Sequence, residues 1–184
     1  GVNICYQTAT YGTQGTANFN NTPGARYLAT GWKDANGEFW VYSGIGYNSS
    51  SNSYLNDLWK YNPSNNQWTW IKGSVLLNQV GNYGTLGTAA PSNAPGARCS
   101  ATGWTDNSGN LWVIGGYGYA TAGPADVLND MWKYDVFNNE WTWMKGSATG
   151  SQPGVYGTQG LGAPANTPGA RRGSIAWKDN ADNL

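Results

Sequence analysis

Side chains alternate between two faces in several short stretches of the chain. In residues 38–43, Trp40 and Tyr42 fall on one face while Phe39 and Val41 fall on the other, which is the period-two pattern of a β-strand. Turn-forming Asp, Asn, Gly and Pro residues separate such stretches. No segment places apolar residues at helical spacing over three turns, so the pattern predicts an all-β fold.

Four such stretches form one unit of the sequence. We expect strands at residues 26–32, 38–43, 57–61 and 68–72. The second of these carries apolar side chains on both faces, so its sheet should be covered on both sides. Four-stranded sheets arranged around an axis meet this requirement, because each sheet lies between two neighbours. The pattern therefore predicts the blades of a β-propeller.

The unit recurs along the chain at a nearly constant spacing. TPGARYLATGW at residues 22–32 returns as APGARCSATGW at 94–104 and as TPGARRGSIAW at 167–177. NDLWKYNPSNNQWTWIKGS, which begins at Asn56, returns from Asn129 as NDMWKYDVFNNEWTWMKGS. Self-similarity at one period over the whole chain is the signature of a repeat architecture.

The repeat divides the chain into blades and long connections. The predicted segments are an interblade loop at 1–22, blade 1 at 23–73, a loop at 74–94, blade 2 at 95–146, a loop at 147–167 and the start of a truncated blade 3 at 168–184. Two blades and one strand cannot close a ring, so we expect a fragment of a longer propeller. Strand-exchanged assembly of several copies is the alternative.

A motif within the units resembles the Kelch repeat, in which a glycine pair follows an aliphatic strand and six residues separate a Tyr from a Trp. The matching residues are Gly115, Gly116, Tyr134 and Trp141 in the second unit, and Gly44, Tyr61 and Trp68 in the first, where Ser43 stands for the first glycine. The chain is most similar to bacterial secreted Kelch-type proteins with long YGTQG to PGAR connections. This resemblance implies a Kelch-type β-propeller with four-stranded antiparallel blades, of which the chain covers about two and a half, and a secreted or cell-surface location in a bacterium.

Composition excludes several classes of partner. Charged residues make up 11% of the chain, with ten Lys and Arg against ten Asp and Glu, so no long-range field attracts nucleic acid or an anionic membrane. No run approaches the roughly 20 apolar residues of a membrane helix, so we expect no membrane insertion. Eleven Trp and twelve Tyr supply the apolar surface for a core.

Residues that build catalytic and metal sites are scarce. Histidine is absent, and Cys5 and Cys99 are the only cysteines. Zinc and copper sites use mostly imidazole and thiolate ligands, and Ser-His-Asp and Cys-His catalysis both need a histidine base. We therefore expect no cofactor, no metal and no catalytic residue in this stretch. Cys5 and Cys99 form either one disulfide or two unpaired thiols, because spacing alone does not establish proximity.

An arginine follows the Pro-Gly-Ala of every unit. Arg26, Arg98 and Arg171 could form a ring of ligand-binding guanidiniums, or they could fix neighbouring strands by pairing with Asp57 and Asp130. Residues repeated in every blade usually serve the blade, because a ligand site breaks the symmetry, so we favour the structural role. Tyr61, Tyr134, Trp68 and Trp141 are structural residues of the repeat as well. The two tryptophans could stack on sugar rings, but alternation inside their strands favours packing between blades.

Aromatic residues in loops are the better candidates for ligand contact. They are Tyr47 and Tyr119 after the second strands, Tyr11, Tyr83 and Tyr156 in the long connections, and Phe137 on a turn. An exposed apolar ring at Phe137 would indicate a protein contact.

Two kinds of function fit this sequence. We favour a non-catalytic extracellular or cell-surface scaffold that presents its loops to a protein or a glycan, or that associates with copies of itself through unpaired strands. The alternatives are a lectin-like carbohydrate-binding module and, by resemblance, the propeller part of a galactose-oxidase-like enzyme. The copper ligands of such an enzyme would have to lie outside this stretch, since it contains no histidine.

Overall fold

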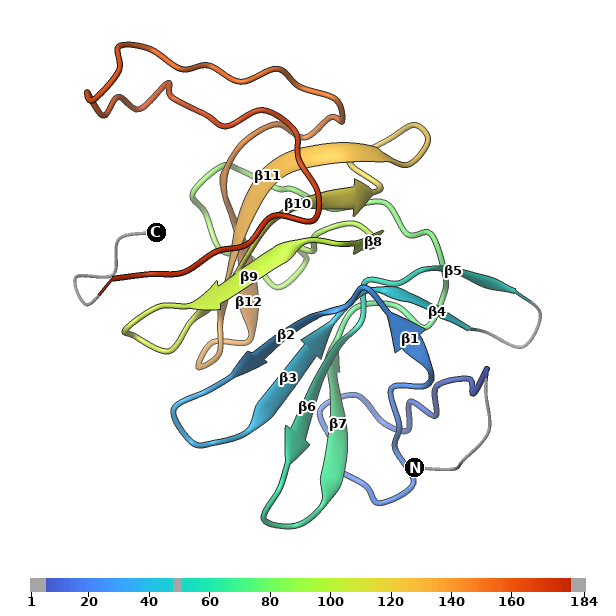
Figure 1. Cartoon of the computed structure of the whole chain (residues 1–184). Helices are drawn as coiled ribbons and strands as arrows, with labels where there is room; N and C mark the ends of the chain where they lie inside the picture. Colours follow the sequence, from blue (N-terminus) through green and yellow to red (C-terminus); the bar gives the residue numbers. More distant parts are fainter. Residues whose placement is uncertain (1–5, 48–50, 180–184) are drawn as a thin grey trace.

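The chain folds into two antiparallel blades joined by long connections (Figure 1). The computed structural model describes residues 6–47 and 51–179, and these residues contain strands but no helix. The strands are β1 (Arg26–Tyr27), β2 (Thr30–Lys33), β3 (Phe39–Tyr42), β4 (Ile45–Tyr47), β5 (Asn52–Tyr54), β6 (Leu58–Asn62), β7 (Gln67–Lys72), β8 (Arg98–Cys99), β9 (Thr102–Thr105), β10 (Leu111–Gly118), β11 (Asp126–Asp135) and β12 (Glu140–Lys145). The predicted all-β class is confirmed.

Blade 1 consists of β2, β3, β6 and β7 in that order. Trp32 pairs with Trp40, and Val41 pairs with Trp59. Because directly paired residues in an antiparallel sheet share a face, Trp32, Trp40 and Tyr42 lie on one face and Trp59 lies on the other. Both faces are therefore rich in aromatic side chains, as the alternation predicted.

Blade 2 repeats the order with β9, β10, β11 and β12, while β8 extends the sheet beside the far end of β10. Trp104 pairs with Trp112, and Tyr134 pairs with Trp141. These pairs correspond to Trp32–Trp40 and Tyr61–Trp68 of blade 1. The two repeated segments thus adopt the same shape.

The first strand of each blade is interrupted, which the sequence pattern did not predict. Leu28, between β1 and β2, has a φ of 56°, and Ser100, between β8 and β9, has a φ of 53°. The break directs β1 to the short hairpin β4–β5 instead of to β3. We call this end of the molecule, formed by β1, β4, β5, β8 and residues 116–119, the rim.

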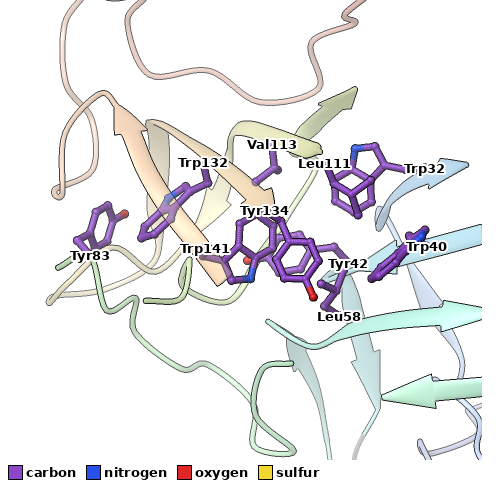
Figure 2. Close-up of a cluster of buried hydrophobic side chains, with 10 residues drawn as sticks. All are labelled: Trp32, Trp40, Tyr42, Leu58, Tyr83, Leu111, Val113, Trp132, Tyr134 and Trp141. Atoms are coloured by element: carbon purple, nitrogen blue, oxygen red, sulfur yellow. The ribbon is translucent and has the colours of Figure 1, made fainter. Parts of the chain in front are cut away.

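The main core lies between the two blades. Side chains of both blades form one cluster there with Tyr83 of the connection between them, and each is at most 7% exposed (Figure 2). The cluster contains Trp32, Trp40, Tyr42 and Leu58 of blade 1 and Leu111, Val113, Trp132, Tyr134 and Trp141 of blade 2. The ring centroids of Tyr42 and Trp141 are 5.4 Å apart, and those of Trp40 and Tyr134 are 5.8 Å apart. Burial of one such ring contributes roughly 4–6 kcal/mol, so this interface is a large part of the driving force for folding.

The exposed fraction of one equivalent tryptophan in each unit depends on how much of it the following unit covers. Trp32 is 7% exposed because blade 2 packs on it, Trp104 is half-buried, and Trp177 is 77% exposed. The segment that contains Trp177 runs beside β9, where Gly173 N–H donates to the carbonyl of Ser100 at 2.9 Å (Figure 1). A blade face is therefore completed by residues of the next unit.

Each of the first two long connections folds back along the outer strand of the blade that follows it. We name three stretches clasp 1 (10–22), clasp 2 (82–94) and clasp 3 (155–167), each closed by an antiparallel bridge between its ends. Gly15 N–H of clasp 1 donates to the carbonyl of Trp70 in β7 at 2.8 Å. Gly87 N–H of clasp 2 donates to the carbonyl of Trp143 in β12, also at 2.8 Å. The clasps thereby cover the outer edge of both blades.

Asn93 fastens clasp 2 to its blade. Its Nδ2 donates to the carbonyl of Thr88 at 2.9 Å and to that of Trp141 at 3.1 Å. Its Oδ1 faces Gly84, where a Cβ would lie only 2.3 Å from that oxygen. Gly84 has a φ of 60°, whereas Gly87 has a φ of 76° and open space at its Cβ position.

Replacing Gly84 with Ala should destabilise the protein more than replacing Gly87 with Ala. Both variants force alanine into a left-handed conformation, at a cost of roughly 1–2 kcal/mol. Gly84→Ala also displaces the buried amide of Asn93, so we expect a further loss of about 1–3 kcal/mol in the free energy of unfolding, measured by urea denaturation. Equal losses for the two variants would contradict the role assigned to Asn93.

Candidate functional site

A buried carboxylate at Asp130 gathers donors from three parts of the chain. Arg98 binds it with two parallel hydrogen bonds, each 2.7 Å long, from Nη1 to Oδ1 and from Nη2 to Oδ2. Tyr83 of clasp 2 donates its hydroxyl to Oδ2 at 2.6 Å, and Trp132 donates Nε1 to the same oxygen at 2.7 Å. Arg98 and Asp130 are fully buried, so the charges satisfy each other within the protein.

Blade 1 contains the same network around Asp57. Arg26 binds this carboxylate at 2.7 and 2.8 Å, Tyr11 of clasp 1 donates at 3.0 Å, and Trp59 donates at 2.7 Å. The two arginines therefore join each clasp and first strand to the third strand of the blade. This is the structural role that the repeated PGAR motif favours over a ring of ligand-binding guanidiniums.

The tyrosines proposed as ligand contacts in the long connections differ in their accessibility. Tyr83 is 4% exposed and its hydroxyl binds Asp130, so the structure places it in the core and does not present it to a ligand. Tyr11 is half-buried in the equivalent position, whereas Tyr156 is 75% exposed. The sequence could not predict which of these tyrosines is buried, because their burial depends on packing against the strands of the blade that follows each long connection.

Replacing Arg98 with Met should severely destabilise the protein. The variant leaves the carboxylate of Asp130 buried without its cation, and breaking a buried pair in this way costs about 3–5 kcal/mol. Arg171→Met is the matched control, because Arg171 is exposed, and its effect should stay within about 0.5 kcal/mol. Urea denaturation checks both values, and a loss below about 1 kcal/mol for Arg98→Met would contradict the analysis.

The buried tyrosines should make the protein sensitive to alkaline pH. Burial and then the nearby Asp130 carboxylate raise the pKa of Tyr83 above its ordinary value of 10.0. Since the folded-state pKa exceeds the unfolded one, stability is fully present below about pH 10 and falls as the pH rises further. Tyr83→Phe should reduce this slope by up to about 1.4 kcal/mol per pH unit relative to the unaltered protein. Urea titrations across the alkaline range give the slopes, and a slope for Tyr83→Phe equal to that of the unaltered protein would refute the assignment.

A cluster of tyrosines lies at the rim, where the two blades meet. The ring centroid of Tyr54 in β5 is 5.8 Å from that of Tyr117 and 6.0 Å from that of Tyr119. The guanidinium carbon of Arg172 lies 5.1 Å from the ring centroid of Tyr117, which is a cation–π contact. The three tyrosines are half-buried, so their rings are held in place and remain partly open to a partner.

Three residues of the rim cluster, Tyr54, Tyr117 and Arg172, stand at positions at which the units differ, whereas Tyr119 corresponds to Tyr47 of the first unit. Tyr27, Cys99 and Arg172 occupy the same position in the three units, directly after the arginine of PGAR. Tyr117 stands where the first unit has Ile45, and Tyr54 stands where the second unit has Val127. A ligand site is expected to break the symmetry of a repeat in this way. We therefore take Tyr54, Tyr117, Tyr119 and Arg172 as the candidate functional site.

The local environment favours the neutral forms of Tyr54 and Cys99. Burial, followed by the neighbouring thiol and phenol groups, raises the pKa of Tyr54. Burial also raises the pKa of Cys99, although a hydrogen bond from Ser100 and the charge of Arg172 oppose that rise. The structure shows Cys99 as a buried free thiol; the alternative pairing with Cys5 stays a prediction because Cys5 lies outside the described residues.

Two further predicted contact residues occupy different ends of the molecule. Tyr47 lies at the rim, packs edge-on against Tyr6 with centroids 5.0 Å apart, and lines a pocket of about 270 Å³ together with Tyr11 and Leu55. Phe137 is 93% exposed on the turn between β11 and β12. The register of β10 and β11 puts that turn at the opposite end of blade 2 from the rim.

Sequence reasoning included Tyr119 but missed Tyr54, Tyr117 and Arg172. Tyr54 and Tyr117 come from different blades, so their proximity depends on how the blades pack. The available signal was the departure from the repeat at each of these positions.

The described residues contain no cluster of three or more metal-ligating side chains. Within the same ranges, no helix is long and apolar enough to cross a membrane.

Comparison with known proteins agrees with this architecture. Residues 46–69, which run from β4 into β7, match the Kelch motif. The chain thus contains a Kelch motif in its first blade, and the second blade repeats the strand order of the first.

Among solved structures, the chain is similar to the protein described as "Structure of YjhT". The two share 22% sequence identity with a TM-score of 0.48, over 69% of this chain and 39% of the other. The chain therefore spans 39% of the length of that protein. No curated protein matches the sequence significantly.

Proposed function

We propose that this chain is part of a non-catalytic, extracellular or cell-surface scaffold that binds a protein partner at the rim. The observation that carries the proposal is the convergence of Tyr119 with Tyr54, Tyr117 and Arg172, the last three of which stand at positions where the repeat is broken. Tyrosine and arginine are enriched at the centres of protein interfaces, where they contribute most of the binding energy. Kelch repeats generally mediate protein interactions.

The rigidity of the site supports a binding role. The backbone beside Cys99 is held by Arg98, whose side chain is tied to Asp130, and the rings of Tyr54 and Tyr119 pack across the blade interface. A partner that binds such a preformed surface loses little free energy to ordering the site. Half-buried tyrosines also have few side-chain torsions left to restrict on binding.

Location and assembly belong to the same proposal. The abundance of Asn, Ser, Thr and Gly and the resemblance to secreted Kelch-type proteins support a secreted or cell-surface scaffold. Self-association through unpaired strands has less support, because clasps 1 and 2 already pair with the outer strands β7 and β12. We therefore place a partner other than a second copy at the rim.

Carbohydrate binding is the second candidate. The site offers aromatic rings and phenol hydroxyls that can stack on and hydrogen-bond to a sugar ring, and its one charged group is Arg172. A glycan partner would be recognised by the same residues as a protein partner. The two candidate functions are therefore distinguished by which ligand binds, because a substitution at the site would weaken either one.

Photo-crosslinking from the rim tests the proposal. A benzophenone amino acid placed at Tyr119 should give one discrete protein adduct in extracts and culture medium of the source organism. The adduct should be competed by the unmodified protein and weakened about tenfold or more by Tyr54→Ser, since interface tyrosines contribute roughly 1–2 kcal/mol each.

The matched control carries the same photo-reactive group at Phe137, at the opposite end of blade 2. Adduct formation from both positions, or adducts that persist in Tyr54→Ser, would contradict a specific rim site. Binding on a glycan array that is lost in Tyr54→Ser, without a protein adduct, would establish the carbohydrate candidate instead.

A further inference from the structure

A polar cleft lies where the outer strand of blade 1 meets clasp 2. Its volume is about 360 Å³, and ligand sites typically span roughly 300–1,000 Å³. The last residues of β7 and the segment that follows them form one wall, and residues 91–94 of clasp 2 form another. Gln14 of clasp 1 and Asn139 of blade 2 also line the cleft. The cleft is therefore assembled from both blades and from the first two clasps.

A nearly buried amide with an unused donor lines this cleft. Asn56 is 7% exposed, and its Oδ1 accepts from Ser74 N–H at 3.0 Å. Within the described part of the chain, its Nδ2 has no hydrogen-bond partner. Leaving such a donor unpaired is unfavourable, so a ligand that brings an oxygen to Nδ2 gains a hydrogen bond at little cost in desolvation.

The second unit shows that this unused donor is a departure from the repeat. Asn129 is the counterpart of Asn56, and its Nδ2 donates to the carbonyl of Pro168 at 3.1 Å. The amide at this position therefore binds a carbonyl oxygen of the next unit in one case and faces a cleft in the other.

A single tyrosine accounts for the difference between the two units. Pro95 is the counterpart of Pro168, and its carbonyl accepts from the hydroxyl of Tyr42 at 3.4 Å. The second unit has Ile114 at the position of Tyr42, and isoleucine carries no hydroxyl. Tyr42 thus occupies the oxygen that Asn56 would otherwise use, and the amide of Asn56 is left for a ligand.

The other polar side chains of the cleft are mostly neutral amides and hydroxyls. Gln79 donates Nε2 to a backbone carbonyl, which leaves its Oε1 as an acceptor. Gln14 and Ser92 are exposed and line the cleft, whereas the next unit has Leu86 and Ala165 at these positions. The cleft of the first unit therefore offers more donors and acceptors than the same positions of the next unit supply.

The charge of the cleft argues against an ionic ligand. Lys72 is the one charged residue in its lining, and its Nζ already donates to the carbonyl of Pro91 at 3.0 Å. The carboxylate of Glu140 also lies near enough to raise the pKa of Lys72, although burial has the larger effect and lowers it. Since no carboxylate lines the cleft and its one cation is partly satisfied, a neutral polar ligand fits best.

We propose that this cleft binds a neutral saccharide, with Asn56 Nδ2 donating to a sugar oxygen and Gln14, Gln79 and Ser92 exchanging hydrogen bonds with its hydroxyls. A sugar hydroxyl both donates and accepts, so it matches amide and hydroxyl side chains. Peptides are held mainly along strand edges or in apolar grooves, whereas polar side chains dominate this lining. The inference is independent of the partner that binds at the rim.

A glycan array that carries neutral and acidic oligosaccharides tests the proposal. The unaltered chain should bind neutral members of the array. When the protein labelled with ¹⁵N is titrated with the best of these oligosaccharides, the side-chain amide resonances of Asn56 and Gln14 should shift. The resonance of Asn129 is the internal control and should not shift, because its amide is already paired.

A double variant changes only exposed positions of the cleft. Gln14→Leu combined with Ser92→Ala installs the residues of the next unit, so it should leave the Tm unchanged and weaken saccharide binding about tenfold or more. Gln159→Leu makes the same change at the equivalent exposed position of clasp 3 and should bind the saccharide as the unaltered chain does.

Tyr42→Phe tests the origin of the unused donor without changing the lining of the cleft. Once the hydroxyl is removed, the carbonyl of Pro95 becomes available to Asn56, as that of Pro168 is to Asn129. Saccharide binding should therefore fall, while thermal unfolding shows that the variant is folded. Unchanged affinity in the folded variant would contradict the role assigned to Asn56.

The other outcomes also decide the matter. A chain that binds no neutral oligosaccharide, or that prefers acidic ones, would overturn the proposal. Saccharide binding that Tyr54→Ser abolishes and the double variant preserves would place the sugar at the rim and overturn the assignment to the cleft. A shift of the Asn56 amide with peptides from a protein digest, but with no glycan, would overturn the saccharide as the ligand.

Discussion

The buried pair between Arg98 and Asp130 fixes the geometry on which the rest of blade 2 depends. An unpaired carboxylate in this environment would be strongly destabilising, so all of its donors have to arrive together. They come from the first strand, from the third strand and from the Tyr83 hydroxyl of clasp 2. Because the Arg98 backbone also binds blade 1, the same residue sets the position of one blade against the other.

The structure separates a repeated framework from a variable rim. Framework residues such as Asp57 and Asp130 have equivalent partners and equivalent distances in both blades. The rim residues Tyr54, Tyr117 and Arg172 differ from their counterparts in other units, and Tyr54 and Tyr117 meet only where the blades adjoin. Structural and binding roles are thus carried by different positions of one repeat, which is why symmetry is a useful guide to function here.

Most of the blade architecture could be predicted from the sequence, because period-two alternation and the repeat are local signals. The break at Leu28 and the hairpin β4–β5 could not, since a left-handed non-glycine residue has no reliable sequence signature. The clasps were predicted as loops, because the backbone N–H groups of Gly15 and Gly87 that bind the outer strands leave no signal in the sequence. At the candidate site, Tyr119 was predicted, whereas the contact between Tyr54 and Tyr117 depends on the packing of two blades.

The side chain that follows the PGAR arginine differs between the units, where it belongs to Tyr27, Cys99 or Arg172. Its backbone is held in place by the hydrogen bonds that the adjacent residues make. Chemistry at this position can therefore change without loss of the aromatic packing beneath. A lineage of such proteins could acquire new specificities by point mutation in single units, while gene duplication of a unit would add another adjustable position with each copy.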